Sequence, residues 1–185
     1  MTKCYSHGKL LLTGEYLVLK GAKALAIPTK MGQMLDFQPD DSKTLKWESL
    51  DNKNLLWFSA SMNILDFSIK NTNDSNIAKR LVGILKTIRD QNNSFLIQNG
   101  GMVKTRLEFD RHWGLGTSST LISNLAQWSQ TNPYTLLTNS FGGSGYDIAC
   151  ATSKSPLIYS VDKTQPHIEA CKFDPEFKSN LYFIY

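Results

Sequence analysis

Residues 113–120, WGLGTSST, combine the residue types that a phosphate-binding loop requires. Glycines allow backbone N–H groups to approach an anion closely, and a helix that begins directly after the loop adds partial positive charge at its N-terminus. The hydroxyls can contact phosphate oxygens or a metal ion. The stretch is not a Walker A loop, since G-x-x-x-x-G-K-[ST] is absent, and it lacks the third glycine of the dinucleotide-binding fingerprint. Taken alone, residues 117–119 also fit an ordinary helix cap in a flexible loop.

Charged residues in two other segments could complete a site for phosphoryl transfer. SHGKLLLTGEYLVLKGAKALAIPT (6–29) contains Lys9 and Glu15, and GGSGYDIACA (142–151) contains Asp147. Phosphoryl transfer needs mainly positioning and charge stabilisation, which a loop, a lysine and an aspartate can supply together. Each residue also has a structural interpretation, as a solvated strand lysine, an acceptor in a turn or an acid near a helix N-terminus. The hypothesis requires Lys9 and Asp147 to lie within hydrogen-bond reach of each other or of one shared substrate atom.

Most of the elements that must position these residues are predicted to be strands. Short apolar runs separated by Gly, Pro and polar residues indicate β-structure in the first 37 residues, and later runs repeat the pattern. Apolar and charged residues alternate in 102–109, as is typical of a strand with one buried face. The predicted strands are 9–13, 16–19, 24–27, 32–37, 55–60, 64–69, 94–98, 102–109, 156–161, 167–173 and 180–185.

Helices are predicted in three places. The first begins after Asp74 or Ser75 as N-cap, because apolar residues then recur at helical spacing. Its buried face consists of Ile77, Leu81, Ile84, Leu85 and Ile88. The second helix follows the 113–120 loop and carries Leu121, Leu125 and Trp128 on one face. The third is a short helix of small residues within 141–153, after a glycine-rich turn.

Composition excludes several classes of function. The net charge of +4 is spread over scattered lysines, so a nucleic acid is not expected as a partner. No apolar run approaches the ~20 residues of a membrane span, and the N-terminus lacks the pattern of a signal peptide. Three widely spaced cysteines without C-x-x-C indicate a reduced, cytoplasmic protein. Three widely spaced histidines do not favour a zinc site.

Taken together, the three segments resemble signature motifs of the GHMP kinases, the family of galactokinase, homoserine kinase, mevalonate kinase and phosphomevalonate kinase. The sequence is most similar to a bacterial subgroup with the motif Gly-Tyr-Asp-Ile-Ala, which stands here at 145–149. The resemblance covers essentially all 185 residues. It implies the α+β fold of the GHMP kinase N-terminal domain, which is ribosomal protein S5 domain 2-like, with a mixed sheet, packed helices and a left-handed β-α-β crossover. Residues 1–185 would form this ATP-binding domain.

The resemblance also implies roles for individual residues. Asp147 would be the catalytic base, and Lys9 would lie near the reacting hydroxyl. ATP and Mg²⁺ are the implied cofactors, with Ser119 as a metal contact. The implied ATP phosphate-binding residues are Gly114, Leu115, Gly116, Thr117, Ser118 and Ser119. The residues implied near substrate or nucleotide are Glu15, His7, Gly143, Ser144, Gly145 and Tyr146. A structural histidine and an aromatic ring used only for packing remain alternatives for His7 and Tyr146.

Two departures from the family pattern qualify what is expected. Residues 131–141 contain no acid, although mevalonate kinases have a magnesium-binding glutamate. The family's third glycine-rich motif and its C-terminal domain are absent from this chain, which ends inside an apolar run. The implied activity is ATP-dependent phosphorylation of a small-molecule alcohol or phosphate, most like that of mevalonate or phosphomevalonate kinase in isoprenoid precursor synthesis. The alternatives are a catalytically silent ligand-binding protein of the same fold and an inactive fragment stabilised as a homodimer.

Overall fold

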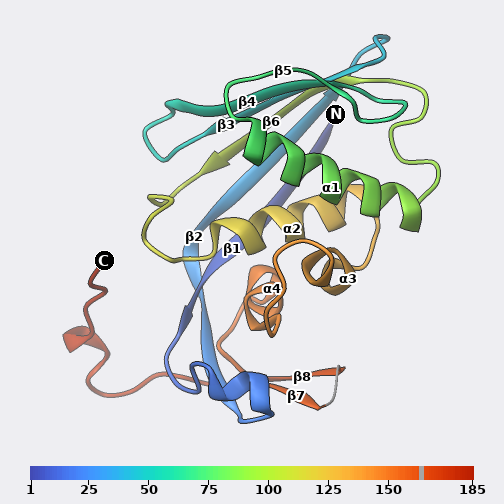
Figure 1. Cartoon of the computed structure of the whole chain (residues 1–185). Coiled ribbons are helices and arrows are strands. Elements are labelled where there is room, and N and C mark those ends of the chain that lie inside the picture. The colour runs from blue at the N-terminus through green and yellow to red at the C-terminus, as the bar shows by residue number, and fades with distance from the viewer. Residues whose placement is uncertain (163–164) are drawn as a thin grey trace.

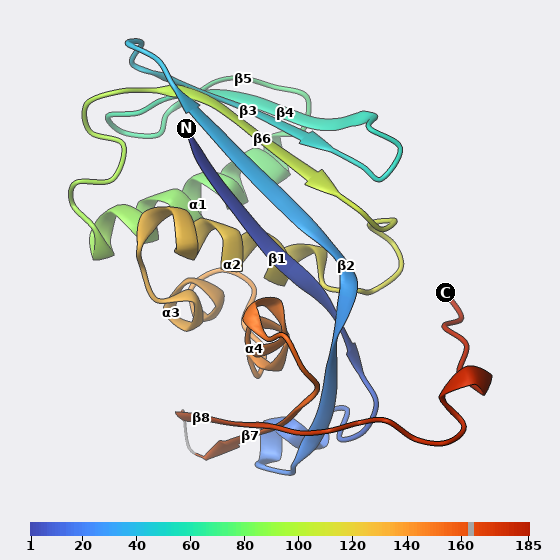
Figure 2. The ribbon, with the colours of Figure 1, turned by 180° about the vertical axis from the view of Figure 1, so that it is seen from behind.

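The computed structural model describes residues 1–162 and 165–185 (Figure 1). Within them, eight strands form one mixed sheet in the order β5-β4-β3-β6-β2-β7-β8, and β1 pairs with β2. The helices α1 to α4 lie on one face of this sheet, as the view from behind makes clear (Figure 2). In these described residues no helix has the length and apolar character that crossing a bilayer demands.

The strands β1 (Thr2–Leu11) and β2 (Ala24–Pro39) form a long antiparallel pair at the centre of the molecule. The expected strands 24–27 and 32–37 are therefore parts of one strand. The prediction of a strand at 16–19 was wrong, because a short 3-10 helix, η1 (Leu17–Lys20), takes its place. Positive φ angles at Gly14, Tyr16 and Gly21 bend the chain around η1, and only its Val18 side chain is buried.

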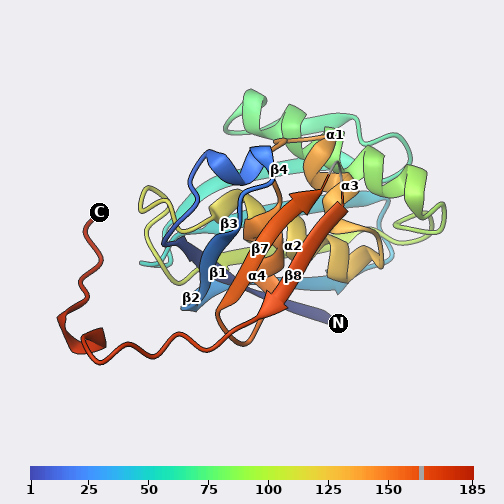
Figure 3. The same cartoon turned by 90° about the horizontal axis from the view of Figure 1, so that it is seen from below.

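The remaining strands complete the sheet. The predictions at 55–60, 102–109 and 156–161 are confirmed in outline, and that at 167–173 is confirmed for its first residues. The bounds are β3 (Thr44–Leu50), β4 (Leu56–Asn63), β5 (Ile69–Thr72), β6 (Gly101–Leu107), β7 (Leu157–Asp162) and β8 (Gln165–Ala170). β3 and β6 pair in parallel, and β3 was not predicted. The β7–β8 hairpin crosses the lower end of the molecule (Figure 3).

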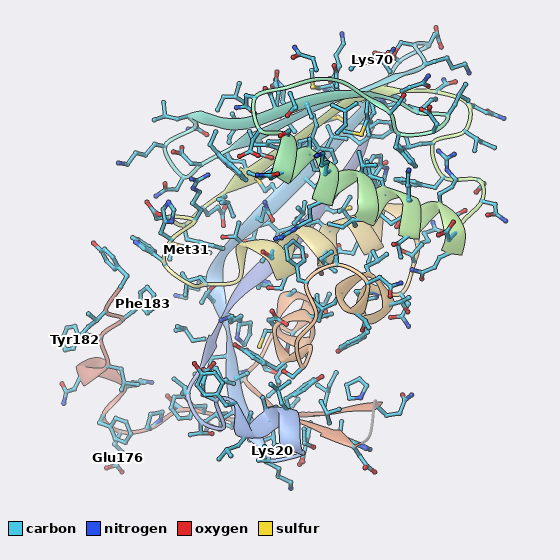
Figure 4. The ribbon with its side chains drawn as sticks, viewed as in Figure 1. Lys20, Met31, Lys70, Glu176, Tyr182 and Phe183 are labelled. Atoms are coloured by element: carbon cyan, nitrogen blue, oxygen red, sulfur yellow. The ribbon has the colours of Figure 1, made fainter. Side chains whose placement is uncertain are left out.

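Three predicted strands were wrong because their apolar residues are used in other ways. Ile64 and Phe95 are buried from turns, and positive φ angles at Phe67 and Leu96 rule out an extended chain there. The strand predicted at 180–185 is absent, because the short helix η2 (Lys178–Asn180) includes its first residue and residues 181–185 form an irregular tail. Tyr182 projects from this tail, away from the body of the molecule (Figure 4).

The helices follow the predicted pattern more closely. Asp74 caps α1 (Ser75–Gln91) by accepting from the backbone N–H groups of Asn76 and Ile77, and the predicted apolar face is largely buried. α2 (Thr117–Ser129) and α4 (Tyr146–Thr152) begin at the two glycine-rich segments. α3 (Pro133–Thr138) was not predicted, although Asn132 as N-cap and proline at the first helical position are typical start signals.

Two clusters of buried side chains hold the site in place. The larger fills the space between the sheet and the helices α1 and α2, and includes Leu35, Trp47 and Leu125. The smaller joins β2 and β7 to α4. Polar contacts also join β1 to α2: the Ser6 hydroxyl of β1 donates to Ser123 or Asn124 of α2 at 2.8 and 2.9 Å. α2 is therefore fixed along β1, and the loop before α2 lies beside the middle of β1.

Candidate active site

The loop at the start of α2 leaves its backbone N–H groups unpaired. Gly114 and Gly116 have φ angles of 71° and 91°, and Gly116 is the N-cap, with no hydrogen bond from a capping side chain. The first N–H group that bonds to the backbone is that of Thr120, to the Gly116 carbonyl at 2.9 Å. Within the part of the chain that the structure describes, the backbone N–H groups of residues 114–119 have no backbone acceptor. Ser119 donates to the Gly116 carbonyl, so the hydroxyls do not form the helix cap considered above.

Strand β1 supports this loop by donating hydrogen bonds from Lys9 to two carbonyl groups of the loop. The Lys9 backbone N–H donates to the Leu115 carbonyl at 3.0 Å, and the Lys9 ammonium donates to the Gly114 carbonyl at 2.9 Å. In a trans peptide the C=O and the following N–H point in opposite directions. The N–H groups of Leu115 and Gly116 therefore point away from Lys9. The Leu115 side chain is buried with Leu107 and Phe109, which anchors the loop from below.

A register shift in the β1–β2 pair brings Lys9 to the helix side of the sheet. The shift lies between His7 and Lys9. Ser6 contacts α2, whereas beyond the shift Lys9 reaches the loop and Leu11 packs against the cluster around α4. In a regular strand, residues 6 and 9 would face opposite sides. The shift changes this alternation, and its position could not be read from the sequence.

His7 is not brought to the loop. Its Nδ1 lies 2.9 Å from the Thr29 carbonyl, and its ring meets Tyr5 edge-on with centroids 5.1 Å apart. Glu15 lies in the exposed turn before η1. Its charge contributes to raising the pKa of Tyr146, so Glu15 belongs to the surroundings of the α4 N-terminus. The structure thus separates two residues that the sequence grouped together.

Asp147 occupies the first turn of α4 and is held by the residues around Gly145. Gly145 is the N-cap with φ 85°, and a Cβ there would lie 2.8 Å from the Tyr134 ring. The Tyr159 hydroxyl donates to the Ser144 carbonyl and fixes the turn before the helix. One Asp147 oxygen accepts from the Ile148 N–H at 3.1 Å. Only glycine fits the backbone and the space at position 145.

The electrostatics of Asp147 connect three distant segments. Burial raises the pKa of Asp147 above its ordinary value, while the charge of Lys9 and the hydroxyl of Ser119 act in the opposite direction. A Cβ placed on Gly116 would lie 2.6 Å from the Ser119 hydroxyl and 3.3 Å from the Lys9 side chain. The Lys9 ammonium reaches Tyr146, the neighbour of Asp147, so the three residues lie in one neighbourhood. No ion pair joins Lys9 to Asp147 among the residues described, since the ammonium contacts Gly114 and lies 5.4 Å from the Tyr146 ring centroid. This geometry allows the Lys9–Asp147 hypothesis only in its second form, in which both residues contact one shared substrate atom.

Besides the Lys9 ammonium, three tyrosines and a cysteine lie near Asp147, and the tyrosines and the cysteine are uncharged at ordinary pH. Burial, with a further contribution from the Asp147 charge, raises the pKa of Tyr134 and of Cys150 to about 12 each. Burial is also the largest cause of the raised pKa values of Tyr146 and Tyr159. Tyr134, Tyr146, Cys150 and Tyr159 therefore do not act as bases near neutral pH, and the Asp147 carboxylate is the basic group among them.

A cavity beside the loop was not predicted. Its volume is about 320 Å³, and Thr117 and Ser118 form part of its wall. Aromatic side chains from separate elements form much of the rest, namely Trp47, Trp57, Phe58 and Phe141. The Trp57 indole N–H is buried and has no partner within the described chain. The sequence placed Trp57 and Phe58 in a strand, but no local signal showed that α1 would face them.

A magnesium ion would find few protein ligands here. The described residues contain no group of three or more His, Cys, Asp or Glu side chains that could hold a metal. The Ser119 hydroxyl and the Asp147 carboxylate lie close together. Magnesium in nucleotide sites is commonly held by one or two carboxylates together with substrate phosphates and water. This donor set fits an ion bound mainly by a nucleotide.

Comparisons with known proteins identify the fold. No protein-family model matches the chain, and neither does any curated protein sequence. The solved structure of Methanococcus jannaschii mevalonate kinase is similar, with 17% identity and a TM-score of 0.65, over 96% of this chain and 57% of that one. Streptococcus pneumoniae phosphomevalonate kinase in complex with phosphomevalonate and AMPPNP has 18% identity and a TM-score of 0.57, over 86% and 50%.

Lactococcus lactis galactokinase, complexed with galactose, has 13% identity and a TM-score of 0.63, over 92% of this chain and 47% of that one. The chain therefore spans about half the length of these structures. It has the α+β fold, with a mixed sheet, of the GHMP kinase N-terminal domain, which confirms the fold predicted from the sequence.

Proposed function

We propose that this chain is the nucleotide-binding part of a GHMP-type kinase, which transfers a phosphoryl group from ATP to the hydroxyl or phosphate group of a small molecule. One observation carries the proposal. Lys9 and Ser119 lie against Gly116, and Lys9 reaches Tyr146 beside Asp147, so three distant segments come together at a loop whose N–H groups are unpaired. Neither a strand lysine nor a helix-dipole acid, taken singly, accounts for this convergence.

The loop would bind the β- and γ-phosphates. Its N–H groups from Gly114 to Ser119 and the N-terminus of α2 offer partial positive charge to an anion. Lys9, whose ammonium lies between the loop and Tyr146 of α4, would offset the negative charge that develops on the acceptor side during transfer. The aromatic cavity begins at Thr117 and Ser118, so it would hold the base, and the Trp57 N–H would donate to an acceptor on that base.

Asp147 would accept the proton of the acceptor hydroxyl. As the acceptor oxygen bonds to the γ-phosphorus and the bond to the ADP oxygen breaks, the proton moves to the Asp147 carboxylate. Its raised pKa makes the carboxylate a stronger base than an ordinary aspartate. Ser119 and Asp147 would hold Mg²⁺ together with the nucleotide; when bound, the ion neutralises charge on the phosphate oxygens.

The acceptor would enter near the N-terminus of α4. Glu15, Gly143, Ser144 and Tyr146 border Asp147 on this side and are proposed as its surroundings. The named relatives include a mevalonate kinase and a complex with phosphomevalonate, so an isoprenoid precursor is the first acceptor to test. Galactose in the third relative makes a sugar the main alternative.

ADP formation tests the proposal directly. The assay supplies ATP and Mg²⁺ with mevalonate, phosphomevalonate, homoserine or galactose in turn. We expect one acceptor to give turnover, and Asp147→Asn to abolish it while ATP affinity stays within about twofold. Asp90→Asn, an exposed acid on α1, is the control and should behave as wild type. Failure to bind ATP, or unchanged turnover by Asp147→Asn, would contradict the proposal. Nucleotide binding without turnover on any acceptor would favour the silent ligand-binding protein.

A further inference from the structure

Arg80 is a cation that has no hydrogen-bond or ion-pair partner among the residues that the structure describes. It lies in the second turn of α1 and is exposed. The other arginines use their N–H groups within the fold: Arg89 donates to the Ile64 and Leu96 carbonyls, Arg106 to Met34 and Arg111 to His112. For Arg80, the described residues supply neither a hydrogen bond nor an ion pair. Its planar set of five N–H donors is left for water or a ligand.

The same side chain lines the cavity beside the phosphate loop. Thr117 and Ser118 belong to the wall of this cavity, and Arg80 is the one charged residue among the described side chains that line it. The rest of the lining is mainly aromatic and aliphatic, with a few uncharged polar groups. A single guanidinium in such a lining marks the place where the cavity would meet the negative charge of a ligand.

Phe141 fixes the direction of the guanidinium. The Arg80 Cζ lies 5.1 Å from the centroid of the Phe141 ring, and this ring also lines the cavity. A cation over an aromatic face is stabilised there, yet its N–H groups at the edge remain free to donate. Phe141 begins the glycine-rich segment that leads to Asp147, so Arg80 is held on the side from which the acceptor site is built.

We propose that Arg80 binds the phosphates of the nucleotide from α1, in addition to the loop at the start of α2. The proposal rests on the proposed function, because it takes a nucleotide as the ligand of the cavity. A guanidinium matches phosphate oxygens with two parallel hydrogen bonds, which an ammonium cannot do. Few acidic side chains around Ser119 are available to hold Mg²⁺, so the Arg80 guanidinium would have a second effect. Part of the phosphate charge is neutralised by the protein, and nucleotide affinity depends only weakly on Mg²⁺.

Binding measurements on a matched pair of variants test this role. Arg80→Met and Lys79→Met each remove one positive charge from the same exposed turn of α1, but Lys79 does not line the cavity. The affinities of ATP, ADP and adenosine are measured by calorimetry with Mg²⁺ and with EDTA. We expect Arg80→Met to weaken ATP and ADP roughly tenfold or more and adenosine less than twofold. Lys79→Met should weaken ATP less than twofold, and Arg80→Lys should restore only part of the loss.

The outcomes separate the two proposals. If the wild type binds no ATP, the proposed function fails before the role of Arg80 arises. If the wild type binds ATP but Arg80→Met and Lys79→Met lose the same affinity, the effect is general electrostatics and the role of Arg80 is overturned. An equal loss of adenosine and ATP in Arg80→Met would place Arg80 at the base and would also overturn it. A wild-type affinity for ATP that collapses in EDTA would contradict the weak dependence on Mg²⁺.

Discussion

Asp147 is the residue at which stability and chemistry are expected to oppose each other. Burial raises its pKa in the folded chain, so the folded state binds the proton more tightly than the unfolded state does. The free energy of unfolding therefore falls as the pH rises from the unfolded pKa through the folded pKa. At neutral pH the charged carboxylate costs stability, and that cost disappears at low pH, where both states are protonated.

Asp147→Asn should accordingly melt at a higher temperature than the wild type at pH 7, although it has lost the carboxylate proposed as proton acceptor. The gain should shrink as the pH is lowered through the raised folded-state pKa of Asp147 towards the ordinary aspartate pKa, and it should be absent below that value. Scanning calorimetry at several pH values measures this, with Asp90→Asn as the exposed control. A lower melting temperature for Asp147→Asn at pH 7 would mean that its contacts with Lys9 and Ser119 outweigh burial.

The sequence could also select single residues as site candidates. The glycines of the two loops, Lys9 and Asp147 were selected because they stand in segments that resemble the motifs of a kinase family, and their roles stay predictions. His7 could not be placed, because the alternation of β1 is interrupted immediately after it. Arg80 and Trp57 gave no signal either, since their roles depend on α1 packing opposite a strand that is distant in the sequence.

At the scale of elements, β1 and the loop before α2 touch so closely that Gly8 has no room for a side chain. A Cβ at Gly8 would lie 2.6 Å from the Thr29 hydroxyl and 2.9 Å from the Leu115 carbonyl. Gly83, in α1, offers the opposite case, because a Cβ there would have nothing within 4 Å. The two glycines form a matched pair for the same substitution.

Gly8→Ala should push the loop away from β1, lower the free energy of unfolding by about 1–3 kcal/mol and weaken ATP binding. Gly83→Ala should raise the free energy of unfolding by about 0.5–1 kcal/mol, because alanine is the better helix former, and leave ATP binding unchanged. Urea unfolding and calorimetric titration measure the two effects. Equal ATP affinity in both variants would show that the loop does not depend on its contact with β1.

Elements were predicted well where buried residues recur at the regular spacing of a helix or a strand, as in α1 and β6. They were missed where a side chain is buried from an irregular backbone. Phe67 and Leu96 adopt positive φ angles that no sequence pattern predicts. Val18 packs into the smaller cluster of buried side chains from a 3-10 helix. The apolar runs at these places correctly indicated buried side chains, but the strands predicted from them were wrong.

At the scale of the whole molecule, the fold could be predicted because three motifs occur in a fixed order along the chain. The topology itself could not, since neither the central position of β2 nor the parallel pairing of β3 with β6 is encoded locally. The chain covers about half of the kinases that it resembles. Nucleotide binding is thus the property to measure on this chain first.

ATP should stabilise the whole chain by mass action. A ligand at a hundredfold excess over its Kd adds about 2.7 kcal/mol to the free energy of unfolding. We expect the melting temperature to rise with ATP concentration in the wild type and equally in Asp147→Asn, which keeps the loop. GTP and CTP serve as controls for the base cavity. No shift at any concentration would place nucleotide binding outside the reach of this chain.

The bond between Lys9 and the Gly114 carbonyl joins residues separated by 105 positions. Contacts of such long sequence separation close large loops and form late in folding. During synthesis, β1 leaves the ribosome long before the segments that it must meet, and Asp147 emerges later still. The nucleotide site proposed above would therefore be complete only after α4 has been made, and no shorter nascent chain should bind a nucleotide.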